Sequence, residues 1–105
     1  MKIKATNLEL TEAIRGYVEE KIGMIEKFLG EIPVLNMDFE VEMTTKHHLK
    51  GKIFRAEANL NLPGQLLRVE KTEKDLYKAI DKVKDHLAQQ IVKHKEKMID
   101  KRRSK

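Results

Sequence analysis

The sequence DLYKAIDKVKDHLAQQIVKHKEKMIDKRRSK, residues 75–105, predicts one long amphipathic helix around which the rest of the chain is organised. Apolar residues recur in it at spacings of three, four and seven, which places them on one stripe. The stripe comprises Leu76, Ile80, Val83, Leu87, Ile91 and Met98. The opposite, solvated surface carries Lys78, Lys82, Asp85, Gln89, Lys93 and Lys97. An apolar stripe must be buried against another layer, so we expect the remaining elements to cover it.

Basic residues are concentrated at the end of this helix. Residues 93–105 include seven Lys or Arg and two acidic residues, so their net charge of +5 equals that of the whole 105-residue chain. The preceding residues are therefore neutral overall. This asymmetry favours a polyanionic partner for the end of the chain. A basic last turn would also complement the helix dipole, which is the simpler interpretation.

The composition is that of a single globular domain with a charged surface. The chain is 40% apolar and 37% charged, which excludes an intrinsically disordered protein. Its few aromatic residues offer few platforms for stacking unpaired bases. No cysteine is present, so disulfides and cysteine zinc sites are excluded. The N-terminus lacks the apolar run of a signal peptide and no window is long enough for a membrane span, so we expect a cytoplasmic protein.

The first third of the chain predicts a short strand and a helix. Residues 2–6 alternate between apolar and polar positions, as a half-buried strand does. Thr11 can cap a helix that Gly30 would end. The helical stripe comprises Ile14, Val18, Ile22, Ile25 and Phe28 or Leu29.

Three strands are predicted in the middle of the chain. Residues 35–44 and 54–62 alternate clearly, and the polar segment 45–52 joins them as the long loop of a hairpin. The turn dipeptide at 63–64 leads into a third strand around residues 66–72. The expected order is strand, helix, three strands, helix.

This order predicts an α+β fold, β-α-β-β-β-α, with a four-stranded sheet and two helices packed on one face. The other face would be wet and mixed in sign, with Lys2, Lys4, Asp38, Glu40, Glu42, Arg55, Glu57, Arg68 and Glu70. A sheet that binds RNA needs aromatic and cationic side chains, so this face is a poor candidate. We expect Tyr17 and Tyr77 at the sheet edge with their hydroxyls outward.

The loop between the two long strands is a second cationic segment. Lys46, Lys50 and Lys52 there suit contact with phosphates. The adjacent His47 and His48 lack a third ligand at a suitable spacing, so no metal site is expected. Ser104 is the only serine and the glycines form no phosphate-binding loop. We therefore expect no enzyme, no cofactor and no small-molecule substrate.

Motifs along almost the whole chain carry a resemblance to one family. They are LTEAIRGYVEEKI at residues 10–22, FRAEA at 54–58 with LPG at 62–64, and DLYKAID at 75–81 with LAQQ at 87–90 and KHKEK at 93–97. Together they resemble the ribosome hibernation promoting factor family, the ribosome-associated inhibitors of bacteria and plastids. The resemblance implies a domain that binds small-subunit rRNA between head and body, where messenger RNA and tRNA would sit. Bound there, it would block initiation and preserve idle ribosomes.

The resemblance also implies which residues contact rRNA. By match to the family's basic positions they are Arg15, Lys21, Lys27, His86, Lys93 and Lys97. Charge and expected exposure add Lys46, Lys50, Lys52 and Lys82. The chain departs from the family at Gln89, where members often have Arg, and at Met24, where they often have Lys, which weakens the cationic groove. We expect residues 1–98 to be a single ribosome-binding domain, with 99–105 as a basic C-terminal tail, and a monomer off the ribosome.

Two other readings remain open. A double-stranded RNA-binding module has similar elements but needs lysines at the start of its last helix, where this chain has the nearly neutral TEKDLY at residues 72–77. A protein-interaction module would pair the last helix with a partner. The apolar stripe thins after Ile91, with only Met98 and Ile99 beyond it, so a long coiled coil is not expected.

Overall fold

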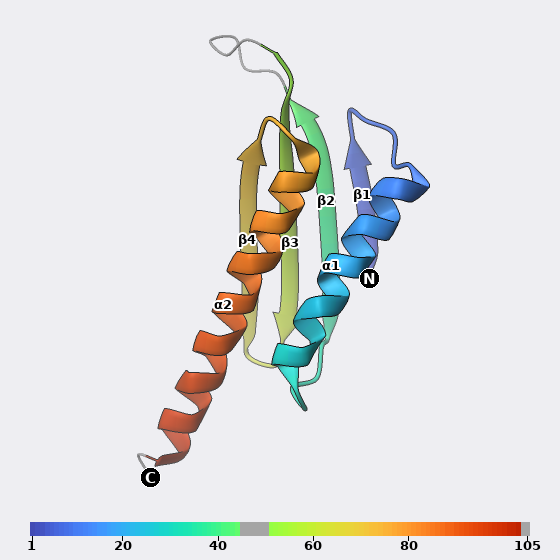
Figure 1. Cartoon of the computed structure of the whole chain (residues 1–105). Coiled ribbons are helices and arrows are strands. Elements are labelled where there is room, and N and C mark those ends of the chain that lie inside the picture. The colour runs from blue at the N-terminus through green and yellow to red at the C-terminus, as the bar shows by residue number, and fades with distance from the viewer. Residues whose placement is uncertain (45–50, 104–105) are drawn as a thin grey trace.

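The structure, a computed structural model, describes residues 1–44 and 51–103, and their side chains up to residue 101. The elements are β1 (Lys2–Thr6), α1 (Glu12–Leu29), β2 (Asn36–Thr44), β3 (Ile53–Leu62), β4 (Gln65–Glu73) and α2 (Leu76–Arg103), as Figure 1 shows. The predicted order and the α+β class are confirmed.

The four strands form one mixed sheet in the order β1-β2-β3-β4. β1 pairs with β2 in parallel, and the other two pairings are antiparallel. The register aligns Ile3 with Phe39, Phe39 with Ala58, and Ala58 with Val69. These four apolar residues therefore form a row across the face of the sheet that the helices cover.

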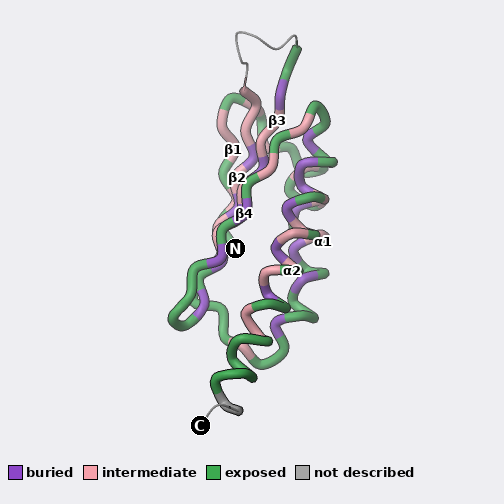
Figure 2. The backbone as a smooth tube through the Cα atoms, turned by 90° about the vertical axis from the view of Figure 1, so that its left-hand side faces the viewer, coloured by how far each residue is buried: buried purple, intermediate pink, exposed green. Residues whose placement is uncertain are grey.

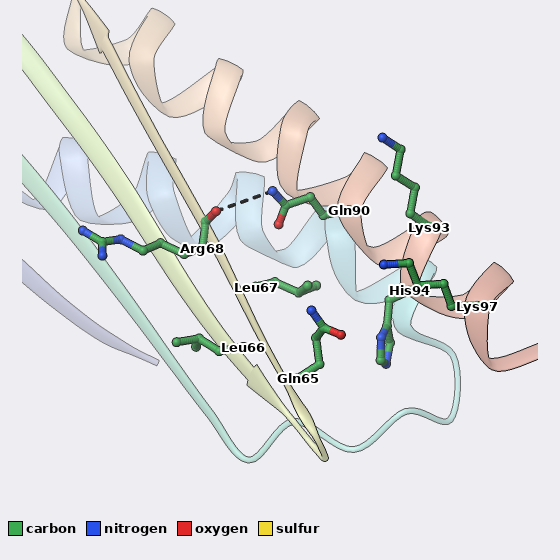
Figure 3. Close-up of a pocket in the computed structure, with 8 residues that line it drawn as sticks. All are labelled: Gln65, Leu66, Leu67, Arg68, Gln90, Lys93, His94 and Lys97. Atoms are coloured by element: carbon green, nitrogen blue, oxygen red, sulfur yellow. Dashed lines mark hydrogen bonds between the residues drawn. The ribbon is translucent and has the colours of Figure 1, made fainter. Parts of the chain in front are cut away.

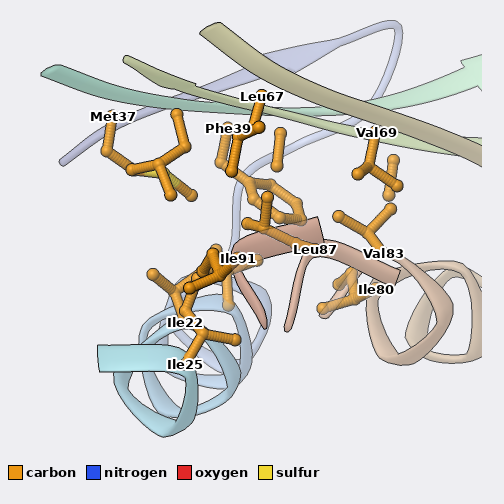
Figure 4. Packing of buried hydrophobic residues seen from close by; sticks show 14 of the residues in the cluster. Ile22, Ile25, Met37, Phe39, Leu67, Val69, Ile80, Val83, Leu87 and Ile91 are labelled. Carbon is orange, nitrogen blue, oxygen red and sulfur yellow. The ribbon is translucent and has the colours of Figure 1, made fainter. Parts of the chain in front are cut away.

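Both helices cover the same face of the sheet, as predicted (Figure 2). The core lies between the two layers, where Phe39, Leu67 and Val69 face the helices (Figure 4). The buried residues of α1 are Val18, Ile22, Ile25 and Leu29. Those of α2 are Leu76, Ala79, Ile80, Val83, Leu87 and Ile91. Neither helix, as far as the structure describes them, combines the length and the apolar character that a membrane crossing requires.

The ends of α1 follow the local sequence. Thr11 is its N-cap, and the hydroxyl of Thr11 accepts a hydrogen bond from the amide of Ile14 at 3.1 Å. Gly30 ends the helix at φ +58°, a conformation that costs glycine little. The predicted stripe left open whether Phe28 or Leu29 faces the core. Leu29 is buried there, whereas Phe28 is 42% exposed.

The far end of α2 does not lie on the core. Met98 was predicted in the buried stripe but is 37% exposed, so this part of the prediction was wrong. The reason is length, because 28 helical residues extend over about 42 Å, whereas the ten-residue strand β3 extends over about 33 Å. The end of α2 therefore projects past the sheet (Figure 1).

The two tyrosines join the helices to each other. The ring of Tyr17 on α1 packs edge to face against that of Tyr77 on α2, with centroids 4.8 Å apart. The Tyr17 hydroxyl donates a 2.6 Å hydrogen bond to the carboxylate of Asp81. The expectation of an outward hydroxyl was therefore wrong for Tyr17, since a half-buried phenol needs a partner and α2 supplies one.

The outer face of the sheet is charged, as predicted, and the charges at its centre are paired with one another. Arg55 donates hydrogen bonds to Glu40, Glu42 and Glu57, and Arg68 binds Glu57 at 2.9 Å. The side chain of Arg55 is partly buried among these carboxylates. Carboxylates outnumber guanidinium groups in this cluster, so the centre of the outer face repels phosphate.

Candidate nucleic-acid interface

The helix layer carries cations that make no ion pair in the described part of the chain. Lys93 and Lys97 stand one turn apart on the exposed side of α2, in the half that lies towards its C-terminus. No salt bridge with a described residue engages either ammonium group. They are therefore available to an external anion at no cost in broken pairs.

A hollow of about 360 Å³ lies between the edge strand β4 and α2, and we call it the β4–α2 hollow. Its lining consists of Gln65, Leu66, Leu67, Arg68, Gln90, Lys93, His94 and Lys97 (Figure 3). The Gln90 side-chain amide donates to the Arg68 carbonyl at 3.5 Å, which links the helix to the strand. Among the described residues, no carboxylate lines this hollow.

The side chain of Arg68 extends away from the hollow (Figure 3). Its guanidinium group bonds to Glu57 on the outer face of the sheet. The cationic groups of the hollow therefore come from α2, as Lys93 and Lys97, with His94 between them. Two ammonium groups beside neutral amides suit the oxygens of a phosphate backbone.

A second hollow of about 460 Å³ lies between the two helices, and we call it the α1–α2 groove. It is lined by Phe28, Ala88, Gln89, Val92, Lys93 and Glu96. Lys93 lines both hollows, so it is the residue that connects them.

Two of the predicted contact residues are engaged within the fold. The Lys21 side chain is only 19% exposed, with its ammonium group 3.7 Å from Asp81 and 5.1 Å from the centre of the Tyr17 ring. Lys82 forms a 2.9 Å ion pair with Glu73. Each ammonium group already has a carboxylate neighbour within the fold, so it attracts a phosphate less strongly than a lysine without one.

The remaining predicted residues are spread over the chain. Arg15 and Lys27 are exposed on α1, and His86 is partly buried on α2. Lys52 is exposed just before β3, whereas Lys46 and Lys50 lie outside the described residues. The structure thus brings Lys93 and Lys97 together in one hollow and leaves the others at separate places.

Most residues of these hollows were not predicted from the sequence, and Gln65, Gln90 and Phe28 are three examples. Gln65 and Gln90 are ordinary polar residues, and only the packing of β4 beside α2 brings them together. The exposure of Phe28 could have been predicted from the sequence. The helical stripe has room for only one of Phe28 and Leu29, so the other must face solvent.

The described residues contain no group of three or more His, Cys, Asp or Glu that could hold a metal ion. The groups whose pKa values the fold shifts most do not line either hollow. Hydrogen bonding to Asp81, with burial, raises the pKa of Tyr17 to about 12. Its hydroxyl therefore stays protonated and serves the helix contact.

Comparison with known proteins identifies the family. The family model for Sigma 54 modulation protein / S30EA ribosomal protein matches residues 1–99. The ribosome hibernation promoting factor of Azotobacter vinelandii is 37% identical over 100 residues, which are 95% of this chain and 86% of that protein.

Two longer relatives match as well. The ribosome hibernation promotion factor of Staphylococcus aureus is 35% identical over 99% of this chain and 52% of its own length. That of Deinococcus radiodurans is 31% identical over 96% of this chain and 51% of its own length. The chain spans about half the length of these two relatives.

Solved structures share the fold. The N-terminal domain of Thermus thermophilus Protein Y has a TM-score of 0.69 at 38% identity, covering 89% of this chain and 94% of that one. A ribosomal subunit interface protein from Coxiella burnetii has a TM-score of 0.67 at 23% identity, covering 91% and 99%. Since the family model covers nearly the whole sequence and the fold agrees, this chain belongs to the Sigma 54 modulation protein / S30EA ribosomal protein family, that of the hibernation promoting factors it resembles.

Proposed function

We propose that this protein is a ribosome hibernation factor that binds small-subunit rRNA in the decoding cleft. The observation that carries the proposal is that Lys93 and Lys97, which form no ion pair with a described residue, both line the β4–α2 hollow of a chain from this family. Binding there would exclude messenger RNA and tRNA and so preserve idle ribosomes. The protein would act in the cytoplasm, as a monomer until it meets the ribosome.

The mechanism is occupancy rather than chemistry. Phosphate contacts would fix the protein, and its volume would exclude other ligands. The fold measures about 54 × 30 × 18 Å, a flat and elongated body that suits a cleft between two larger parts.

The charge distribution supports one orientation. The outer face of the sheet carries Glu40, Glu42 and Glu57 around Arg55, and a phosphate backbone would be repelled there. The helix layer carries Lys93 and Lys97 on α2, beside the edge strand β4, and no carboxylate of the described residues lines their hollow. The rRNA should therefore meet the helix side of the molecule.

Co-sedimentation with purified ribosomal subunits tests this proposal. We expect retention on the small subunit that tRNA competes away and that Lys93→Gln/Lys97→Gln weakens. The matched control is Lys2→Gln/Lys4→Gln, which removes two exposed cations from the outer face of the sheet and should bind as the wild type does.

Two outcomes would overturn the proposal. Equal binding to naked duplex RNA would favour a generic double-stranded RNA-binding module. No binding to either ribosomes or duplex RNA would favour a protein partner for the end of α2.

A further inference from the structure

Phe28 is an aromatic side chain that the core does not use. It lies in the last turn of α1 and is 42% exposed, whereas its neighbour Leu29 is buried in the core. Val92 on α2 is similarly exposed, and both line the α1–α2 groove with the partly buried Ala88. The groove thus has an apolar floor with one aromatic ring.

The rim of this groove is polar and mixed in character. Gln89, Lys93 and Glu96 all come from α2, and together they offer an amide, an ammonium group and a carboxylate. A phosphate would meet repulsion from Glu96. A nucleobase fits better, because its edge carries both hydrogen-bond donors and acceptors and its face stacks on an aromatic ring.

Lys93 connects this groove to the β4–α2 hollow, which has the opposite chemistry. The hollow is lined by two lysines and by no carboxylate of the described residues, whereas the groove offers an aromatic ring and a mixed rim. Since Lys93 lines both hollows, a strand whose phosphates meet Lys93 and Lys97 passes beside the groove that Phe28 lines. The two hollows together match the two parts of an unpaired nucleotide.

We propose that the α1–α2 groove binds one unpaired rRNA base, with Phe28 as the stacking platform and Gln89 and Glu96 contacting the edge of the base. This inference rests on the proposed function, since it specifies what part of the rRNA the helix side recognises. It adds stacking on an aromatic ring to the phosphate contacts of the lysines.

The first test compares variants that separate aromatic character from apolar volume. Phe28→Leu keeps an apolar side chain but removes the ring, and we expect its affinity for small subunits to fall about tenfold. Phe28→Tyr keeps the ring and should bind within about twofold of the wild type. The control Leu35→Ala truncates an exposed apolar residue outside both hollows and should leave the affinity for small subunits unchanged. Thermal melting of each variant checks that it is folded.

The second test uses fluorescence, because the chain contains no tryptophan. Phe28→Trp places a single reporter in the groove, and a base stacked on it should quench its emission when small subunits are added. Leu35→Trp is the matched reporter outside the groove and should keep its emission.

The outcomes separate this inference from the function on which it depends. If wild-type protein fails to bind small subunits, the proposed function falls and the base site with it. If the wild type binds, and Phe28→Leu binds equally well, only the base site is overturned. Weakened binding of Phe28→Leu with no quenching of the Phe28→Trp reporter would also overturn it, in favour of an apolar contact with a ribosomal protein.

Discussion

Arg55 organises the outer face of the sheet through its carboxylate partners. The Thr6 hydroxyl donates a 2.7 Å hydrogen bond to Glu40, and this bond, with that of Arg55, holds the pKa of Glu40 below its usual value. Burial raises the pKa of Glu57, but hydrogen bonds from Asn59 and Arg68 outweigh it and leave that pKa lowered. Both carboxylates are therefore more stable as anions in the folded state.

Replacing Arg55 by leucine should leave these carboxylates without their shared partner. We expect Arg55→Leu to lower the free energy of unfolding by about 2 kcal/mol near neutral pH, less than for a fully buried pair because the cluster is partly solvated. The loss should shrink as the pH falls below the ordinary glutamate pKa of 4.5, where the orphaned carboxylates protonate.

Urea unfolding of wild type and variant at about pH 7 and about pH 3.5 measures this difference. The wild type should itself lose stability over the same interval, because carboxylates with a lowered folded pKa stabilise the fold above their unfolded pKa and cease to do so as they protonate. Arg68→Leu, which removes a more exposed guanidinium group, is the control with the smaller effect. An equal loss at both pH values would contradict the assignment.

Tyr17 on α1 contacts α2 both through its ring, which packs against Tyr77, and through the hydrogen bond from its hydroxyl to Asp81. Tyr17→Phe should lower the free energy of unfolding by about 1 kcal/mol near neutral pH, since it leaves the ring contact intact and removes only the bond to Asp81. The folded pKa of Tyr17, about 12, lies above the ordinary value of 10.0, so its contribution is complete below pH 10 and is lost as the pH rises towards 12.

Denaturant midpoints of wild type and Tyr17→Phe should therefore converge between about pH 10 and about pH 12. Tyr77→Phe serves as the control, because its hydroxyl makes no hydrogen bond within the described residues and its loss should cost little. A difference that stayed constant in alkali would mean that the hydroxyl is not the source of the stabilisation.

At the scale of elements, α2 has two parts with different roles. Its apolar side is buried against the sheet and α1 as far as Ile91, through residues such as Leu87, and its last turns project past the end of the sheet. The part up to Ile91 therefore contributes stability, and the part after it provides the exposed surface that includes Lys97.

Truncations in the two parts should differ strongly. Leu87→Ala removes a fully buried side chain and should cost about 3 kcal/mol, whereas Met98→Ala at a 37% exposed position should cost less than about 1 kcal/mol. Equilibrium unfolding of both variants by urea gives the comparison. Comparable losses would mean that the end of α2 is packed in solution.

At the scale of the whole molecule, the two faces differ in how their charges are used. The outer face of the sheet pairs its charges internally around Arg55, whereas the helix side keeps Lys93 and Lys97 unpaired within the described chain. The centre of the outer face and the part of α2 after Ile91 therefore differ electrostatically, in a chain whose net charge is +5. A polyanion should bind from the helix side.

The salt dependence of binding follows from this arrangement. About seven phosphate contacts would give a log-log slope of affinity against salt of about −5 to −6. Lys93→Gln/Lys97→Gln should make that slope shallower by about 1.4 to 1.8, since each contact contributes about 0.7 to 0.9. Affinity for small subunits measured across a series of salt concentrations gives both slopes, with Lys2→Gln/Lys4→Gln as the charge-matched control. An affinity that salt does not change would contradict the phosphate contacts.

The sequence by itself determined the elements and their order. Hydrophobic periodicity assigned the faces of both helices and of the strands, and the caps at Thr11 and Gly30 bounded α1, because these signals act between residues that are close in the chain. The concentration of cations from Lys93 onward was equally visible, since charge can be counted without a fold.

Only the tertiary structure decided which of these residues act together. Tyr17 and Asp81 are 64 positions apart in the sequence. The Tyr17 hydroxyl and the Lys21 ammonium group both contact Asp81 only because α1 packs beside α2. The parallel pairing of β1 with β2, the placement of Phe28 in a groove and the meeting of β4 with Lys93 have the same origin. Each is a contact between distant segments, and its geometry is set by packing rather than by local sequence.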